Sequence, residues 1–271
     1  MSDLCILLLG DTDRLEFRGA RASLDALGRV IAAESIESAA ALLSGGQLAP
    51  DVIVAAQAFP GQFSAEAIDR LRWLAPLARV VGLLGSWCEG EMRSGRPWPA
   101  AVRVYWHQWP ARCARELSRL RDGLSSTWAL PVTASEEERY LGIAEEPAPP
   151  QSGLIAVHTP SFEMQDWLSS ACRRRGWSTV WLRPHRRTAV SGVIAAVFDA
   201  AECRGEELAA LERMATSLKP APIIALLEFP RIEDHQRALS AGASAVLSKP
   251  LLIDDLIWQM DRLVRPRVQA G

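Results

Sequence analysis

Lysine is scarce in this 271-residue sequence, and neither sign of charge is in large excess. Only Lys219 and Lys249 stand among 30 basic residues, so arginine carries nearly all of the positive charge. The formal net charge of −2 excludes a chain-wide positive field that would attract nucleic acid. We therefore do not expect nucleic acid as a partner, and we treat the position of each lysine as informative.

Cysteine is also sparse, and the five cysteines are scattered along the chain. They form no Cys-x-x-Cys pair and no Cys/His spacing that suits zinc, which indicates reduced thiols with structural roles. The apolar run in Met1–Gly10 is too short to span a membrane, and it lacks a basic flank and a small-residue cleavage site. These features predict a cytoplasmic protein without a metal site.

Common catalytic motifs are missing as well. The sequence contains no G-x-G-x-x-G or Walker phosphate loop, no G-x-S-x-G nucleophile turn and no Cys/His arrangement suited to hydrolysis. We therefore expect no enzymatic activity and no bound cofactor.

Apolar residues make up 49% of the chain, and its length suggests two domains. Short apolar runs alternate with amphipathic helical patterns, which predicts two doubly wound α/β domains, each with a five-stranded parallel sheet between two layers of helices. In the first half the expected strands are Leu4–Leu9, Val30–Ala33, Asp51–Ala56, Val80–Leu84 and Val102–Trp106, and the expected helices are Arg14–Leu27, Ser35–Leu43, Ala65–Leu74 and Ala111–Leu120. Glycines and prolines at close spacing predict a loop over Ser86–Ala101.

The second half repeats this order. Its expected strands are Leu154–Val157, Thr179–Leu182, Val193–Phe198, Ile223–Leu227 and Ala245–Leu247, and its expected helices are Phe162–Arg175, Glu206–Ser217, Arg231–Ala241 and Asp254–Leu263. An offset of about 143 residues aligns the two halves and places Ala56 opposite Asp199. We therefore predict a tandem repeat of one fold, with domains over residues 1–123 and 153–271.

Residues 124–152 differ in composition from both halves. Glu136–Glu138, Glu145, Glu146 and Pro147–Pro150 cannot supply an apolar core. We predict a Pro/Glu-rich linker here, with one short helix at Ser135–Leu141 whose first turn Ser135 would cap.

The segment Ala238–Leu256, ALSAGASAVLSKPLLIDDL, has the most specific pattern in the chain. A helix end, a glycine suited to a C-cap, a short strand, Lys249-Pro250 and an amphipathic helix follow one another. This order resembles the last third of a response-regulator receiver domain of the CheY-like family. The resemblance extends over nearly the whole chain, and it implies a role in two-component-type signalling. It is specific only in the second half.

The resemblance implies a defined set of site positions. In receivers, two acids after the first strand bind Mg²⁺ with an acceptor Asp after the third strand, a Thr or Ser follows the fourth strand, and a Lys neutralises the phosphoryl group. In the second half these positions fall on His158 and Thr159, Asp199, Leu227 and Lys249. Asp199 is phosphoacceptor-like and Lys249 phosphate-pairing-like, but Mg²⁺ would meet one carboxylate instead of three. We interpret His158 as a hydrogen-bonded strand-end residue, since no second metal ligand lies near it in sequence.

The first half is more degenerate. Its acid pair falls on Gly10 and Asp11, its acceptor position on Ala56, its hydroxyl position on Leu84 and its lysine position near His107. Because alanine has no carboxylate, this half is predicted to accept no phosphate.

Four tryptophans gather near the end of the first half. Trp87, Trp98, Trp106 and Trp109 lie in or after the segment that lacks a regular helix. Tryptophan is favoured in binding hot spots, so these rings are candidates for a partner or ligand surface. The alternative is that they pack over the sheet in place of the missing helix, which we prefer for Trp106 because it lies at a strand end.

Arginines form a group in the second half. They are Arg173–Arg175, Arg183, Arg186 and Arg187. Arginine can grip phosphate with two hydrogen bonds, which allows a nucleotide or nucleic-acid partner, but a solvated face is the more ordinary explanation.

The sequence therefore predicts a non-catalytic signalling module made of tandem pseudo-receiver domains. Its expected partners are other signalling proteins or a second copy of the chain, through the last strand and flanking helices within Arg231–Leu263. One alternative is a phosphorelay response regulator that uses Mg²⁺ and is phosphorylated at Asp199. Another is a small-molecule sensor that uses the tryptophans of the first domain. Asp199 and Lys249 could also be no more than an ion pair that closes one end of the sheet.

Overall fold

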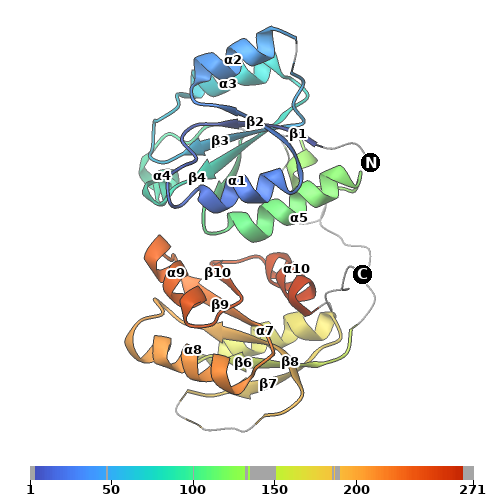
Figure 1. Cartoon of the computed structure of the whole chain (residues 1–271), viewed down its shortest axis with the longest axis vertical. Helices are drawn as coiled ribbons and strands as arrows, with labels where there is room; N and C mark the ends of the chain where they lie inside the picture. The colour runs from blue at the N-terminus through green and yellow to red at the C-terminus, as the bar shows by residue number, and fades with distance from the viewer. Residues whose placement is uncertain are drawn as a thin grey trace. The chain divides into compact units, whose positions relative to one another are not determined.

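The computed structural model describes residues 4–46, 48–99, 101–131, 134, 151–184, 186 and 190–264. The chain divides into two compact units, Met1–Ala144 and Glu145–Gly271. Each unit contains one five-stranded parallel sheet with helices on both faces (Figure 1). None of the helices in these described residues is both long and apolar enough to cross a bilayer.

The sheet of the first unit has the strand order β2-β1-β3-β4-β5. Its strands are β1 (Leu4–Leu9), β2 (Gly28–Ala33), β3 (Val52–Gln57), β4 (Arg79–Leu84) and β5 (Val102–Tyr105), and its helices are α1 (Arg18–Asp25), α2 (Ile36–Ser44), α3 (Ala65–Leu74), α4 (Glu91–Ser94) and α5 (Trp109–Arg121). The helix expected from Arg14 begins four residues later, because Arg14–Phe17 forms a turn that follows a hydrogen bond from the Asp13 amide to the Asp11 carboxylate.

Two helix layers cover this sheet. Helices α1 and α5 pack side by side on one face, and α2 and α3 pack side by side on the other (Figure 1). The α2/α3 layer buries its apolar side chains against alternate residues of the strands, including Leu7, Ile53 and Val80. Serine caps begin both helices, since Ser35 and Ser64 accept hydrogen bonds from the backbone of the first turn.

The fourth helix of the first unit is almost absent, as expected for Ser86–Ala101. A 3₁₀ turn, η1 (Ser86–Cys88), and the single turn of α4 replace it. Gly90 begins α4 with a positive φ of 88°, a conformation that an L side chain rarely adopts.

The first unit extends beyond residue 123, so the linker begins later than expected. A 3₁₀ turn, η2 (Thr127–Ala129), packs on the unit and buries Trp128, which is 2% exposed, against the ring of Trp109. The carboxylate of Glu116 in α5 accepts hydrogen bonds from the Ser126 hydroxyl at 2.6 Å and from the Thr127 amide at 2.7 Å. Composition did not predict this packing, because the segment around η2 is mostly polar and a single aromatic ring, that of Trp128, holds it on the unit. The expected helix at Ser135–Leu141 lies outside the described residues.

The sheet of the second unit has the order β10-β9-β8-β6-β7, which is the order of the first sheet with each strand replaced by its counterpart. Its strands are β6 (Leu154–His158), β7 (Ser178–Leu182), β8 (Val193–Asp199), β9 (Ile223–Glu228) and β10 (Ala245–Lys249), and its helices are α7 (Phe162–Arg174), α8 (Gly205–Ser217), α9 (Ile232–Ser240) and α10 (Ile253–Val264). The prediction of two five-stranded doubly wound parallel sheets is therefore confirmed.

The second unit lacks one helix that the first unit has. In the first unit α2 connects the second and third strands, whereas the described residues between β7 and β8 contain no helix. Helices α8 and α9 share one face of the sheet and bury Leu211, Met214 and Ala238 with the side chain of Phe198 (Figure 1). Beside α8, the part of this face formed by β6 and β7 has no counterpart of α2 over it among the described residues.

Candidate functional site

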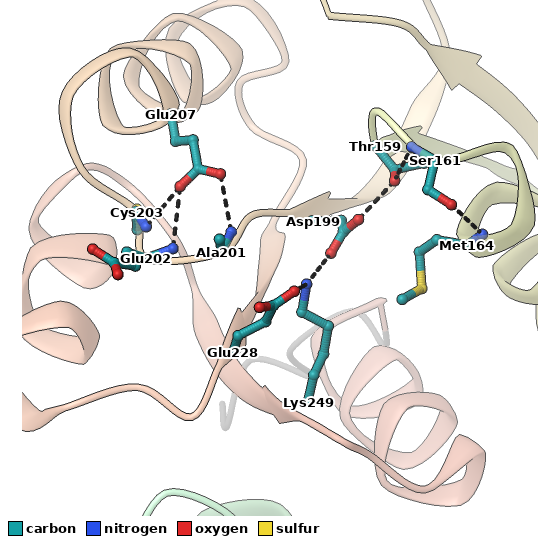
Figure 2. Close-up of polar contacts among 10 residues, drawn as sticks. All are labelled: Thr159, Ser161, Met164, Asp199, Ala201, Glu202, Cys203, Glu207, Glu228 and Lys249. Atoms are coloured by element: carbon teal, nitrogen blue, oxygen red, sulfur yellow. Dashed lines mark hydrogen bonds and ion pairs between the residues drawn. The ribbon is translucent and has the colours of Figure 1, made fainter.

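Three side chains meet at the carboxyl ends of strands in the second unit. Asp199 ends β8, Lys249 ends β10, and Thr159 follows the last residue of β6. The Lys249 Nζ atom lies 2.6 Å from Asp199 Oδ1, and the Thr159 hydroxyl donates to Asp199 Oδ2 at 2.6 Å (Figure 2). Each oxygen of this carboxylate is therefore engaged by the chain itself.

The strand register explains why these residues meet. His158 pairs with Phe198 in the parallel ladder between β6 and β8, so the next residues, Thr159 and Asp199, lie at the same level. Side chains alternate between the faces of a strand, which places both on the face opposite to Phe198. Regular parallel pairing of β6 and β8 thus brings together Thr159 and Asp199, which are 40 residues apart in sequence.

The surroundings of Thr159 hold it in one orientation. Its Oγ1 atom also accepts a hydrogen bond from the Ser161 amide at 3.1 Å, and the Ser161 hydroxyl in turn caps α7 by accepting from the Met164 amide at 3.1 Å. Thr159 is fully buried, and its carbonyl oxygen accepts from the indole of Trp181 at 2.9 Å. The threonine is therefore part of the helix start and not a loose surface residue.

The ion pair lies at the edge of the protein interior. Asp199 is 7% exposed and the Lys249 side chain 15% exposed, so water is largely removed from the contact. A second acid, Glu228 at the end of β9, lies 3.3 Å from Lys249 Nζ, but its side chain is 61% exposed. The short contact to the buried carboxylate is the stronger of the two, because solvent screens the exposed one.

The donor set does not fit Mg²⁺. This cation prefers octahedral oxygen ligands and, in receivers, several carboxylates. Asp199 supplies one carboxylate, its oxygens already contact an ammonium and a hydroxyl, and the neighbouring position holds Thr159 instead of an acid. Within the described part of the chain, no cluster of three or more His, Cys, Asp or Glu side chains is arranged to hold a metal.

The loop after Asp199 is fixed by a residue that the sequence did not single out. The Glu207 carboxylate accepts backbone hydrogen bonds from Ala201, Glu202 and Cys203 at 2.9, 3.2 and 3.0 Å (Figure 2). Three converging amides hold this turn even though Cys203 has a positive φ of 54°. The available signal was the pair of acids at the start of α8, where helix N-termini favour negative charge.

His158 lies on the other side of the sheet from Asp199. Its ring stacks on Phe198, with centroids 4.6 Å apart and planes 11° apart. Burial lowers the pKa of His158 below its ordinary value, although the negative charge of Asp199 opposes this. The ring is therefore neutral at pH 7, and no described side chain joins it to form a metal cluster.

The hydroxyl position of the family is apolar in both units. Leu84 and Leu227 are fully buried, and Leu227 packs in the core beneath α8 and α9. Neither side chain has a group that could hydrogen-bond a phosphoryl oxygen.

In the first unit the geometry excludes an acid at Gly10. The register of β1 and β3 places Gly10 at the level of Ala56, as Thr159 lies at the level of Asp199. Gly10 has a φ of +104°, and a Cβ atom there would lie 2.7 Å from the Ala56 carbonyl oxygen. Gly10 therefore corresponds to Thr159. The acid pairs expected from the sequence match Gly10 with His158, so that alignment is shifted by one residue.

The lysine position of the first unit needs a similar adjustment. Trp106 stands one residue beyond the β5 partner of Leu84, as Lys249 stands one residue beyond the β10 partner of Leu227. Trp106 therefore occupies the level expected for His107. His107 itself is buried, and its Nε2 atom lies 3.1 Å from a Glu89 carboxylate oxygen.

The four tryptophans do not form a common surface. Trp98, Trp106 and Trp109 are 4%, 5% and 1% exposed, whereas Trp87 is 75% exposed. The Trp98 indole donates to the Phe63 carbonyl oxygen at 2.8 Å and packs in the α2/α3 core. The expected binding surface is therefore wrong for the three buried rings: Trp98 belongs to the α2/α3 core, and Trp109 packs against Trp128. Trp87 remains exposed.

The arginines of the second half have separate surroundings. Arg175 is buried and forms an ion pair with Asp261 of α10 at 3.0 Å, so it ties two elements of the core together. Arg173 is exposed, and the Arg183 guanidinium lies over the Trp181 ring at 4.1 Å. Arg187 lies outside the described residues. The described members of this group do not form one continuous basic surface.

No protein-family model matches the chain, and no curated protein matches it significantly. Among solved structures, a response regulator from Thermotoga maritima matches 43% of this chain and 100% of its own, with 17% identity and a TM-score of 0.37. A CheY-like receiver domain protein from Methanospirillum hungatei matches 42% of this chain and 94% of its own, with 17% identity and a TM-score of 0.36. NtrX from Brucella abortus matches 42% of this chain over only 26% of its own length, with 17% identity and a TM-score of 0.35.

Each of these matches spans less than half of this chain at low identity. The assignment of fold therefore rests on the structure itself. Two parallel sheets with the order 2-1-3-4-5, covered by helices on both faces, define the flavodoxin/CheY-like α/β fold.

Proposed function

We propose that the chain is a non-catalytic signalling module that binds other proteins through two receiver-like domains. The observation that carries this proposal is the engagement of Asp199 by Lys249 and Thr159, one on each carboxylate oxygen. Because both carboxylate oxygens are engaged, neither is free to act as a nucleophile towards a phosphoryl group. In the first unit, Ala56 offers no carboxylate at the same level.

Phosphoryl transfer to Asp199 would face two obstacles. One carboxylate oxygen must attack the phosphorus atom, which requires breaking a contact of 2.6 Å to either the ammonium or the hydroxyl. The transferring group also needs its negative charge neutralised by a metal and fixed donors, and the site offers one carboxylate to such a metal. Slow or no phosphorylation follows from both.

Incubation of the 271-residue chain with acetyl phosphate and Mg²⁺ tests this proposal. We expect intact-mass spectrometry to show no phosphorylated species, and beryllofluoride with Mg²⁺ to leave the amide NMR signals of β8 and β10 in place. The Asp199→Asn variant is the matched control. Phosphate incorporation in the wild type that disappears in this variant would overturn the proposal.

That outcome would favour a phosphorelay response regulator, the second candidate. Its support is that Asp199 and Lys249 stand at the ends of β8 and β10 in direct contact, as the resemblance to receivers implies. A small-molecule sensor built on the tryptophans of the first unit is not proposed further, because Trp98, Trp106 and Trp109 are buried.

We place the partner surface on α9, β10 and α10 of the second unit, where a second copy of the chain or another signalling protein would bind. This region carries Leu239, which is 40% exposed, and Trp258 with Arg262 over its ring at 5.5 Å. Sedimentation velocity of the wild type and of Leu239→Glu tests self-association. A monomeric wild type would exclude the second copy as partner.

A further inference from the structure

The second unit has a cavity of about 830 Å³ on the α8 side of its sheet. The cavity extends from Leu182 at the end of β7, past Phe198 of β8, to Met214 of α8. It lies where the first unit has α2 beside α3, and the described residues between β7 and β8 contain no helix to fill that place. Its volume is in the range of about 300–1,000 Å³ typical of small-molecule sites.

Part of the cavity lining is apolar and aromatic. The rings of His158 and Phe198 stack 4.6 Å apart with an interplanar angle of 11°, and both line the cavity together with Leu182, Ala210 and Met214. Because these two rings face each other, a planar ligand ring can extend the stack on the outer face of the pair.

The rim carries arginines whose charge is not paired with an acid among the described residues. Arg183, Arg186 and Arg213 all line the cavity, and none of them forms an ion pair or a side-chain hydrogen bond with another described residue. Arg183 is held in place, since its guanidinium lies over the Trp181 ring at 4.1 Å. Guanidinium groups recognise carboxylate and phosphate through paired hydrogen bonds.

The acids of the lining do not balance these arginines. The Glu207 carboxylate is taken up by three backbone amides of the loop after β8. Asp199 is engaged by Lys249 and Thr159. Glu206, the remaining acid, is exposed to solvent, as are the three arginines, and its single negative charge is smaller than their combined positive charge.

From these features we propose that the cavity binds a small planar aromatic anion. The ring extends the His158–Phe198 stack on its outer face, and its carboxylate, phosphate or sulfonate group binds Arg183 and Arg213 at the rim. Asp199 also lines the cavity, but its carboxylate oxygens are engaged by Lys249 and Thr159, so the proposal does not use them.

Fluorescence titration of the 271-residue chain with 8-anilinonaphthalene-1-sulfonate tests the proposal, because this probe joins planar aromatic rings to one anion. We expect saturable binding to one site, and an increase in Kd of about tenfold or more in Arg183→Gln/Arg213→Gln. The matched control, Arg70→Gln/Arg174→Gln, removes the same charge from two exposed arginines outside the cavity and should change Kd less than about twofold. The uncharged N-phenyl-1-naphthylamine should bind more weakly than the sulfonate.

A second variant separates loss of the cavity from loss of charge. Ala210→Trp places a large side chain in the cavity without changing charge, and it should also abolish probe binding. Circular dichroism and thermal unfolding confirm that each variant is folded. Absence of saturable binding, an unchanged Kd in Arg183→Gln/Arg213→Gln, or equal affinity for the uncharged probe would each overturn the proposal.

Discussion

Thr159 donates its hydroxyl hydrogen to one oxygen of Asp199 at 2.6 Å, while Lys249 contacts the other oxygen at the same distance. Resemblance to receivers implies an acid at or beside the position of Thr159, where it would help to bind a metal. A hydroxyl at this level donates a hydrogen bond that favours the charged form of the carboxylate, so this contact needs no metal ion. The charge of Asp199 is therefore stabilised by side chains of the same chain, without a metal ion.

Removing Lys249 should be more harmful than removing the whole ion pair. Lys249→Met leaves the charge of Asp199 buried without a counterion, which we expect to cost about 3 kcal/mol. In Asp199→Asn/Lys249→Met no charge is left uncompensated, and the oxygen of the introduced amide can still accept from Thr159, so the double variant should be more stable than the single one. Hydrogen-exchange mass spectrometry on peptides covering β8 and β9 measures the local stability. A double variant less stable than Lys249→Met would contradict this expectation.

Two tryptophans of the first unit should differ sharply in their effect on stability. Trp98→Ala removes a ring that is 4% exposed and a hydrogen bond to the Phe63 carbonyl, and we expect a loss of about 3–5 kcal/mol. Trp87→Ala changes a residue that is 75% exposed and should alter stability by less than about 0.5 kcal/mol. Urea unfolding followed by circular dichroism provides the comparison, with Trp87→Ala as the control. Similar losses in both variants would show that the burial of Trp98 contributes little.

Much of the fold was predictable from the sequence because its strands are short, apolar and bounded by glycine, proline or helical patterns. Ala65–Leu74 was expected with the bounds that α3 has, and the last strand was expected over Ala245–Leu247, two residues shorter than β10 (Ala245–Lys249). These features are local, so periodicity and turn residues suffice to predict them.

The remaining features depend on contacts between distant residues. Burial of Trp98 follows from the space that the shortened fourth helix leaves above Gly82, and Trp128 is buried because α5 presents Trp109 to it. The role of Glu207 requires three backbone amides that converge only after the loop has folded. A single sequence contains no periodic signal for such contacts, since they depend on three-dimensional shape.

Stability of the second unit should fall as the pH drops below about 6.5, the ordinary pKa of histidine. Burial lowers the pKa of His158 in the folded state, so the unfolded chain binds a proton first and the stability contribution is lost as the pH falls towards the lower folded value. His158→Phe keeps an aromatic ring on Phe198 and removes the titrating group. Urea midpoints at pH 7.5 and 5.5 should therefore differ less in this variant than in the wild type. An equal difference in both proteins would assign the pH dependence to other groups.

Restoring an acid at Thr159 should make the second unit respond to divalent cations. Thr159→Asp brings a second carboxylate beside Asp199 in a buried position, and two adjacent carboxylates repel each other unless one is protonated or a cation joins them.

In metal-free buffer we therefore expect Thr159→Asp to have a lower Tm than the wild type, and Mg²⁺ or Mn²⁺ should raise its Tm in a concentration-dependent way. A cation at about 100 times its Kd would stabilise the folded state by about 2.7 kcal/mol. Thr159→Asn is the matched control, because it has the same shape without the charge and should show no response to metal. The wild type should also show none, since its single carboxylate is already engaged by Lys249 and Thr159. A wild-type Tm that rises with Mg²⁺ as steeply as that of Thr159→Asp would mean that Asp199 binds the metal without a second acid. The inference that Lys249 and Thr159 prevent metal binding at Asp199 would then be wrong.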